Sequence, residues 1–192
     1  MKIAILLADG FEETEALFTV DILRRAKLDV VTISIGKSNI VESSHSIRVI
    51  ADKKIDEIDK NELEMLIIPG GYKGVENLRS SEEVIEIIKY LNGRNKFLAA
   101  ICAGPIVLNE AGILEGKRVT SFPSQEFIES FDKSFYDNES LVVRDGNILT
   151  SRGPATTILF GLEIVKIFGK DVNELKKSLL YDSLAEYIKN NE

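Results

Sequence analysis

The chain has 192 residues, of which 44% are hydrophobic and 29% are charged, and its formal net charge is -7. This length fits a single domain spanning residues 1–192 with a sizeable core. The acidic balance and the lack of a basic cluster argue against nucleic acid as a partner. No apolar run reaches the roughly 18 residues of a membrane span, so we expect no membrane partner. The apolar start of the chain is typical of a first strand rather than a signal peptide, which favours a cytoplasmic protein.

Reactive side chains are scarce in this sequence. It has one cysteine, Cys102, and one histidine, His45. A single cysteine excludes an internal disulfide and any multi-cysteine metal site, and zinc held by these two residues is not expected. Neither a Walker A loop nor a GxGxxG motif is present, so no nucleotide-binding loop is indicated. We therefore expect chemistry that uses no metal and no cofactor.

Apolar runs rich in β-branched residues alternate with helical patterns in the first half of the chain. Residues 2–8 predict a buried strand, and an apolar stripe from Ala16 to Leu23 predicts the helix that follows it. Alternating apolar residues between 40 and 50 predict a short antiparallel excursion. Ser80 and Glu83 form a predicted capping box for a helix that stops near residue 93. The other predicted core strands are 29–35, 64–71 and 96–101.

The second half continues with the same alternation. Residues 104–112 predict a helix, 118–122 a short strand, and 141–151 a hairpin with an Asp-Gly turn. Pro154 is predicted to start a helix that runs to residue 168. The last amphipathic pattern predicts one helix over 171–188. Continuous apolar strands between helices indicate a doubly wound α/β fold, with a parallel sheet covered on both faces and a small β-hairpin.

Cys102 lies where a predicted strand turns into a predicted helix. The small residues Ala100 and Gly104 stand two positions before and after it, which is the spacing of a nucleophile elbow. A sulfur at a helix N-terminus is expected to have a lowered pKa, because the helix dipole and free N–H groups favour the thiolate. The alternative is that Cys102 is a small buried hydrophobe, as most single cysteines are.

Other polar groups follow the neighbouring strands, and the carboxyl ends of parallel strands gather at one edge of the sheet. Of the three acids Glu12, Glu13 and Glu15, one could face the sulfur, as a protonated hydrogen-bond donor or as a base, while the others are solvated. Gly70 and Gly71 could offer backbone N–H groups to an oxyanion, together with Ala103, or could form a plain tight turn.

Four motifs carry a resemblance to a known family. They are "ILLADGFEETEALFTVDILRRA" (5–26), "LIIPGG" with "ENL" (66–78), "AAICAGPIVLNEAGIL" (99–114) and "ILTSRGPATT" (148–157). Together they resemble the DJ/ThiJ/PfpI superfamily, and within it the branch of the parkinsonism-associated protein deglycase. The resemblance implies a flavodoxin-like sheet, of the kind also found in class I glutamine amidotransferases, and a homodimer.

The resemblance also implies roles for individual residues. Cys102 is the reactive thiol, and Glu15 is the acid that hydrogen-bonds the sulfur. Gly71 and Ala103 supply the oxyanion-type amides, with Gly70 beside them.

Two arginines and one missing histidine complete the comparison with the superfamily. Arg152 is placed near the pocket rim, and Arg25 near the neighbouring subunit's site. Relatives that act as peptidases or glyoxalases carry a histidine beside the thiol, but this chain has Ala103 and Phe122 at the corresponding positions. His45 is expected on the surface or at an interface. A Cys–His pair is therefore not supported, which makes peptidase activity improbable.

Two functions compete for this site. The first is a cofactor-free, cysteine-dependent glyoxalase or deglycase with a stress-response role, acting on small reactive aldehydes such as methylglyoxal or on their adducts. The second is a redox-sensing or protective protein in which Cys102 oxidises to the sulfinate without significant turnover. A role in thiazole or thiamine-precursor metabolism is not supported, because the sequence shows no recognisable thiazole or phosphate pocket.

Overall fold

The computed structural model describes residues 2–191 and is built around one seven-stranded sheet. The strand order is β10-β11-β7-β6-β1-β2-β5, and every pairing in it is parallel except that of β10 with β11. The strands are β1 (Lys2–Leu7), β2 (Asp29–Ser34), β5 (Lys53–Lys54), β6 (Leu63–Ile68), β7 (Phe97–Ile101), β10 (Val142–Asp145) and β11 (Ile148–Ser151).

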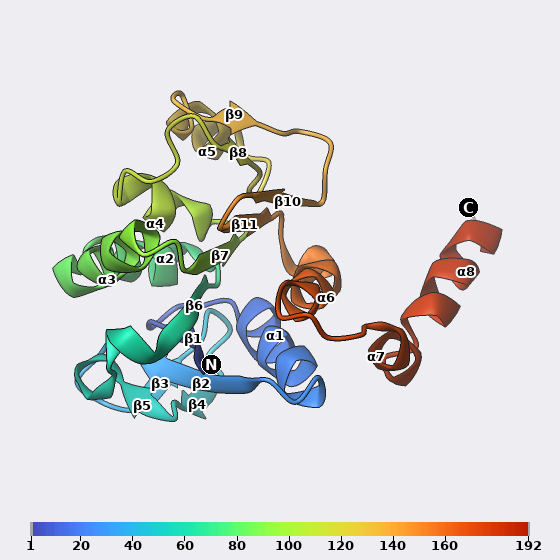
Figure 1. The fold of residues 1–192 in the computed structure, drawn as a ribbon, viewed down its shortest axis with the longest axis horizontal. Helices are drawn as coiled ribbons and strands as arrows, with labels where there is room; N and C mark the ends of the chain where they lie inside the picture. Colours follow the sequence, from blue (N-terminus) through green and yellow to red (C-terminus); the bar gives the residue numbers. More distant parts are fainter. Residues whose placement is uncertain (1, 192) are drawn as a thin grey trace.

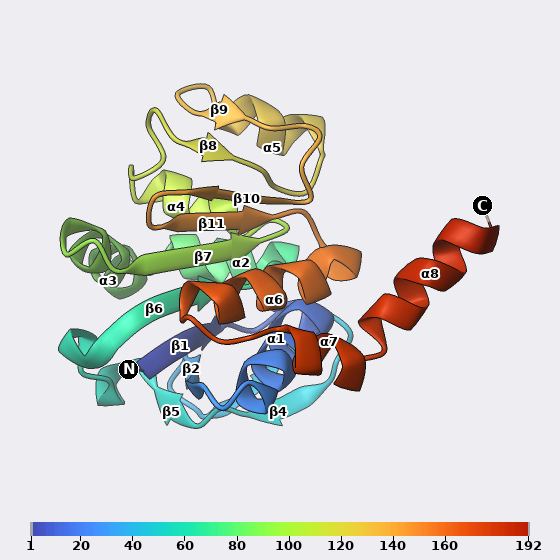
Figure 2. The same ribbon diagram turned by 45° about the vertical axis from the view of Figure 1, so that its right-hand side comes forward.

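Helices cover both faces of this sheet (Figures 1 and 2). One face carries α1 and α6, and the opposite face carries α2, α3 and α4. The bounds of these helices are α1 (Glu13–Arg25), α2 (Tyr72–Arg79), α3 (Glu82–Gly93), α4 (Pro105–Glu110) and α6 (Thr157–Ile167). The expected doubly wound α/β fold is therefore confirmed, with the seven-stranded sheet as its middle layer.

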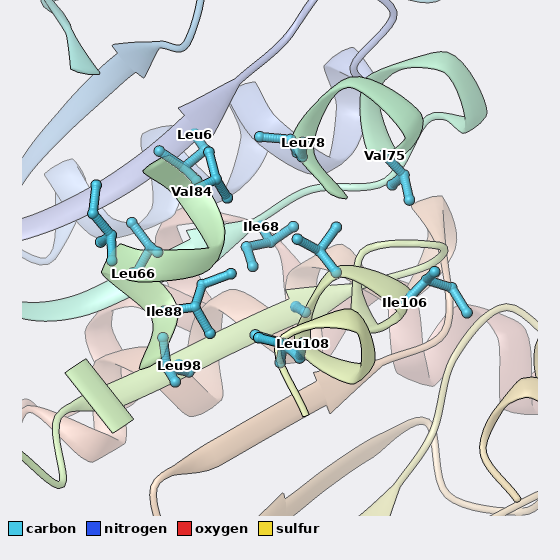
Figure 3. Close-up of a cluster of buried hydrophobic side chains, with 14 of the residues drawn as sticks. Leu6, Leu66, Ile68, Val75, Leu78, Val84, Ile88, Leu98, Ile106 and Leu108 are labelled. Carbon is cyan, nitrogen blue, oxygen red and sulfur yellow. The ribbon is translucent and has the colours of Figure 1, made fainter. Parts of the chain in front are cut away.

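Alternation along each strand divides the core into two clusters. In β6, Leu66 and Ile68 face α2, α3 and α4, whereas Met65 and Ile67 face α1 and α6. Successive side chains of a strand point to opposite faces, and both faces here are covered, so the strands read as continuous apolar runs. Figure 3 shows the first cluster, in which side chains from α2, α3 and α4 meet those of the strands.

Shorter elements lie outside the main layers. Two small sheets pair β3 (Ile40–Glu42) with β4 (Arg48–Ile50) and β8 (Arg118–Val119) with β9 (Phe135–Tyr136). The remaining helices are α5 (Gln125–Ser130), α7 (Asn173–Ser178), α8 (Tyr181–Asn191) and the 3-10 turns η1 (Ile55–Glu57), η2 (Lys60–Glu62) and η3 (Pro154–Thr156). The antiparallel excursion near residues 40–50 and the hairpin of β10 and β11 are confirmed.

Two local predictions are wrong, and a third is confirmed only in part. The cap of α3 is Ser81, whose hydroxyl accepts a hydrogen bond from the Val84 N–H, because Ser80 closes the unpredicted helix α2. The predicted helix 171–188 is two helices, separated at Leu180 with φ of 54°. The short strand predicted over 118–122 forms only at Arg118–Val119, where it pairs with β9.

The C-terminal part of the chain ends in a projecting helix. Helix α8 extends away from the rest of the molecule (Figures 1 and 2) and has no buried residue among those described. Within residues 2–191, no helix combines the length and the apolar character needed to cross a membrane.

Candidate active site at the carboxyl edge of the sheet

Three loops meet at the carboxyl edge of the sheet because β7, β6 and β1 are neighbours in it. The loop after β7 carries Cys102, the loop after β6 carries Gly70 and Gly71, and the loop after β1 leads into α1 and Glu15. The expected gathering of these residues at one edge is therefore what the topology produces.

Cys102 occupies a sharp strand-to-helix turn. Its φ is 63°, in the left-handed region that costs a non-glycine residue about 1–2 kcal/mol. Two hydrogen bonds hold this conformation: the Cys102 N–H donates to the Ser151 carbonyl at 3.0 Å, and its carbonyl accepts from the Phe122 N–H at 2.9 Å. The strained backbone is therefore fixed by the neighbouring strand β11 and by the loop after β8. This geometry agrees with the predicted nucleophile elbow.

Two glycines allow the loops to approach this closely. A Cβ at Gly70 would lie 2.6 Å from Glu15 Oε2 and 2.7 Å from Cys102 Cβ. A Cβ at Gly104 would lie 2.5 Å from the Ile68 carbonyl oxygen and 2.9 Å from that of Ile101. The contacts at Gly104 are with backbone, which cannot swing aside as a side chain can.

Replacing Gly104 with alanine should therefore destabilise the protein by about 1–3 kcal/mol, the usual cost of overpacking. The matched control is Gly93→Ala at the end of α3, where nothing lies within 4 Å of the added methyl. That change should be neutral or slightly stabilising. Urea unfolding of both variants measures the difference, and equal stabilities would contradict the assignment of Gly104 as a close-approach residue.

Glu15 is the acid that faces the sulfur. It is fully buried at the start of α1, and its Oε2 accepts a hydrogen bond from the Gly70 N–H at 2.7 Å. Burial raises the pKa of this carboxyl to about 7, while hydrogen bonds from the Cys102 thiol and the Gly70 N–H oppose that rise. The second oxygen, Oε1, is buried without a fixed hydrogen-bond partner among the described residues. Glu15 can therefore exchange a proton near neutral pH.

The expected lowering of the Cys102 pKa is wrong. Burial is the largest cause that raises the pKa of the thiol, and the charge and hydrogen bond of Glu15 raise it further. The Ala103 N–H, which is directed at the sulfur, acts in the opposite direction. The helix that follows, α4, has only six residues and starts three positions after the cysteine, so its dipole offers little compensation.

Cys102 and Glu15 therefore behave as a coupled pair. Two negative charges on hydrogen-bonded neighbours in a buried site are unfavourable. The pair therefore loses one proton near neutral pH and retains the other. Reactivity of the sulfur then depends on the carboxylate that can accept the thiol proton, rather than on an isolated thiolate.

The predicted amide donors fall into two groups. Gly70 donates its N–H to Glu15, so it orients the acid and is not free to bind an oxyanion. Gly71, with φ of 91°, and Ala103 both line the cavity above the sulfur. These two residues remain the candidates for holding a developing negative charge.

Arg152 does not line this cavity. Its guanidinium donates to the carbonyl oxygen of Asn138, and its backbone N–H donates to Thr156 Oγ1 at 3.3 Å. The residue that reaches the cavity from this segment is Pro154. Arg152 was predicted near the rim of the cavity. It lies in the loop beside the cavity, where its hydrogen bonds hold that loop.

The cavity above Cys102 has a volume of about 390 Å³. Besides the residues already named, it is lined by side chains that no sequence pattern singled out. They are Tyr72, Phe127, Ser124 and Glu126. Tyr72 starts α2, and the other three belong to α5 or its N-cap; neither short helix was predicted. Phe122, at the position of the missing histidine, also lines the cavity.

His45 lies outside the cavity, as expected of a surface residue. Its Nδ1 is 2.7 Å from Glu13 Oε1 and 3.9 Å from Glu12 Oε2, and the side chain is 70% exposed. These three residues are grouped closely enough for metal ligation, with ligand atoms within 4.8 Å of one another. His45 hydrogen-bonds to Glu13, and the Ser44 hydroxyl contacts all three residues within hydrogen-bond distance. The prediction of no metal site stays a prediction.

The fold and this site define a class: a doubly wound α/β protein with a cysteine elbow facing a buried glutamate. A model of the DJ-1/PfpI family matches residues 1–167, and the chain belongs to that family. It is 39% identical over 182 residues to Protein DJ-1 homolog B of Arabidopsis thaliana, covering 93% of this chain but 41% of that protein. The chain thus spans about two-fifths of that relative's length.

Two solved structures show the same likeness. The crystal structure of Drosophila melanogaster DJ-1beta is 31% identical with a TM-score of 0.89, covering 93% of this chain and 97% of the other. Toxoplasma gondii DJ-1 in an oxidized form is 33% identical with a TM-score of 0.83, covering 95% and 97%. Both similarities extend over nearly the whole of this chain.

Proposed function

We propose that the protein is a cofactor-free, cysteine-dependent glyoxalase-like enzyme that acts on small reactive aldehydes, with a protective role under stress. The observation that carries this proposal is the pairing of the Cys102 thiol with a buried carboxyl of pKa about 7 at the floor of one cavity. Such a pair combines a nucleophile with a base tuned to the working pH.

The reaction on methylglyoxal can be followed atom by atom. The sulfur forms a bond to the aldehyde carbon as Glu15 takes the thiol proton, and the carbonyl electron pair moves to oxygen near the Gly71 and Ala103 amides. That oxygen is then protonated, which gives a hemithioacetal. Glu15, again ionised, removes the proton from the former aldehyde carbon and returns it to the adjacent carbon. The proton of the new hydroxyl group passes to the oxygen on that adjacent carbon, which leaves the thioester of lactate. Water hydrolyses the thioester to lactate and restores the thiol.

With no histidine in the cavity lining, the buried carboxyl of Glu15, which faces the sulfur, is the proton carrier that we assign to both transfers. Phe122 occupies the cavity wall where relatives place a histidine, and His45 lies outside the cavity. We therefore expect turnover to be slow and to depend strongly on this carboxyl.

Lactate formation from methylglyoxal tests this function. The wild-type protein should produce lactate without added thiol or metal, and Cys102→Ala should produce none above the uncatalysed rate. The matched control is Ser130→Ala, a small polar change at the end of α5 outside the cavity, which should retain the activity. Lactate formed equally by wild type and Cys102→Ala would exclude the proposed mechanism.

A redox-sensing role is the second candidate. It is favoured by Glu15 Oε1, which lies buried without a fixed partner and can donate a hydrogen bond, once protonated, to a sulfinate on Cys102. The Toxoplasma gondii relative has been solved in an oxidized form, which makes oxidation of this chain worth testing. Mild peroxide should add two oxygen atoms to Cys102 before it modifies either methionine, and mass spectrometry would show the opposite order if the idea is wrong.

A further inference from the structure

The charges around the cavity above Cys102 are of one sign. Three carboxyl groups line it, from Glu12, Glu15 and Glu126, and no lysine, arginine or histidine does so within residues 2–191. The Glu12 carboxylate raises the pKa of both Glu15 and Cys102, so its field extends to the sulfur. Arg152, the cation in the loop after β11, does not line the cavity and donates a hydrogen bond to the Asn138 carbonyl.

The wall of the same cavity is aromatic. Tyr72 and Phe122 line it while remaining 66% and 45% exposed, and Phe127 and Pro154 complete the apolar surface. The 2.9 Å hydrogen bond from the Phe122 N–H to the Cys102 carbonyl holds the two backbones together, so Phe122 starts from a fixed point beside the cysteine. These aromatic faces are in contact with water beside a nucleophile. Covering them with an apolar or aromatic group of a ligand removes that surface from water, which favours binding.

We propose that this cavity selects uncharged electrophiles that carry an aromatic or bulky apolar group, and that it discriminates against electrophiles that carry a carboxylate. Glu12 and Glu126 are the specificity-determining residues for charge, and Phe122 is the platform for the apolar group. The proposal rests on the proposed function in that it names the substrate class of the same site. An aromatic α-oxoaldehyde is then a better substrate than methylglyoxal, and glyoxylate is a poor one.

Alkylation of Cys102 tests the charge selectivity without requiring turnover. In this reaction the sulfur forms a bond to carbon, the carbon–iodine bond breaks, iodide leaves and the thiol proton passes to Glu15 or to water. Iodoacetamide and iodoacetate have nearly the same size and differ by one negative charge. Because Cys102 is the only cysteine, every alkylated thiol reports on this cavity.

The preference for iodoacetamide over iodoacetate should exceed that of free cysteine by about tenfold, as expected for a negative group near two carboxylates at low salt. Glu12→Gln should remove most of this excess, and Glu126→Gln a smaller part because Glu126 is exposed. The matched control is Glu129→Gln on the same helix α5, which alters the same charge outside the cavity. A preference equal to that of free cysteine, or an equal change in Glu129→Gln, would overturn the proposal.

The aromatic platform is tested by an iodoacetamide that carries a benzyl group on its nitrogen. It should alkylate the wild-type protein several-fold faster than iodoacetamide does, and in Phe122→Ser the ratio of the two rates should fall toward that of free cysteine. Phe135→Ser, at an exposed aromatic of β9 outside the cavity, is the control. No advantage of the benzyl reagent in the wild-type protein would overturn this part. Because no lactate is measured, either failure is distinguishable from failure of the glyoxalase function.

Discussion

Glu15→Gln should make the protein more stable than wild type at pH 8, by about 3 kcal/mol. The carboxyl has a pKa near 4.5 in an unfolded chain and about 7 in the folded protein. Between these values the folded state binds a proton that the unfolded state has released, so this group's contribution to stability falls as the pH rises. A glutamine keeps the shape of the side chain and has no charge to bury.

Urea unfolding of both proteins from pH 4 to pH 8 measures this effect. The stability difference between the variant and wild type should be small at pH 4, grow through the window from about 4.5 to 7, and level off above it. Glu126→Gln, at an exposed position, is the control and should show little change with pH. A difference that does not vary with pH would mean that Glu15 ionises normally in the folded protein.

Glu15→Gln should also reduce methylglyoxal turnover by about 10²- to 10⁴-fold, the usual contribution of a positioned acid or base. The expected loss is large because the same carboxyl accepts the thiol proton and moves the proton between the substrate carbons. In the wild-type protein kcat/KM should rise with pH through about 7, as the carboxylate forms. The residual kcat/KM of the variant should not rise with pH around 7, and lactate assays across the pH range measure this. If the variant keeps the rise, the ionising group is not Glu15.

The elbow at Cys102 was predictable because its signals are local in the sequence. The end of an apolar strand, the small residues on either side of the cysteine and the start of the next helix all lie within a few positions. The alternation of strands and helices likewise identified the doubly wound sheet. Both inferences depend on patterns that one segment carries by itself.

The parts that failed depend on contacts between distant segments. The sequence placed Cys102 near a helix N-terminus but could not show how deeply the loops bury it, so the direction of its pKa change was wrong. Gly70 was one candidate for an oxyanion donor, with a plain tight turn as the alternative, yet its N–H points to a carboxyl 55 residues away in the chain. Choosing Glu15 from among three neighbouring acids required either the family resemblance or the fold itself.

The cavity walls were missed for a different reason. Helices α2 and α5 have eight and six residues, too short for a clear apolar period, and Tyr72 starts the first while Glu126 and Phe127 belong to the second. Helix α2 begins directly at the Gly70-Gly71 turn, which favours a loop when read alone.

The pH dependence of Cys102 alkylation by iodoacetamide, compared between wild type and Glu15→Gln, tests the central claim that the thiol and the carboxyl share one proton. In the wild-type protein the rate should rise with a midpoint at about pH 7, because ionised Glu15 can take the thiol proton. In Glu15→Gln the midpoint should move above that of an ordinary thiol, since burial raises the pKa of Cys102 and no carboxylate accepts the proton. The same midpoint in both proteins would show that Cys102 ionises independently of Glu15 and would contradict the account.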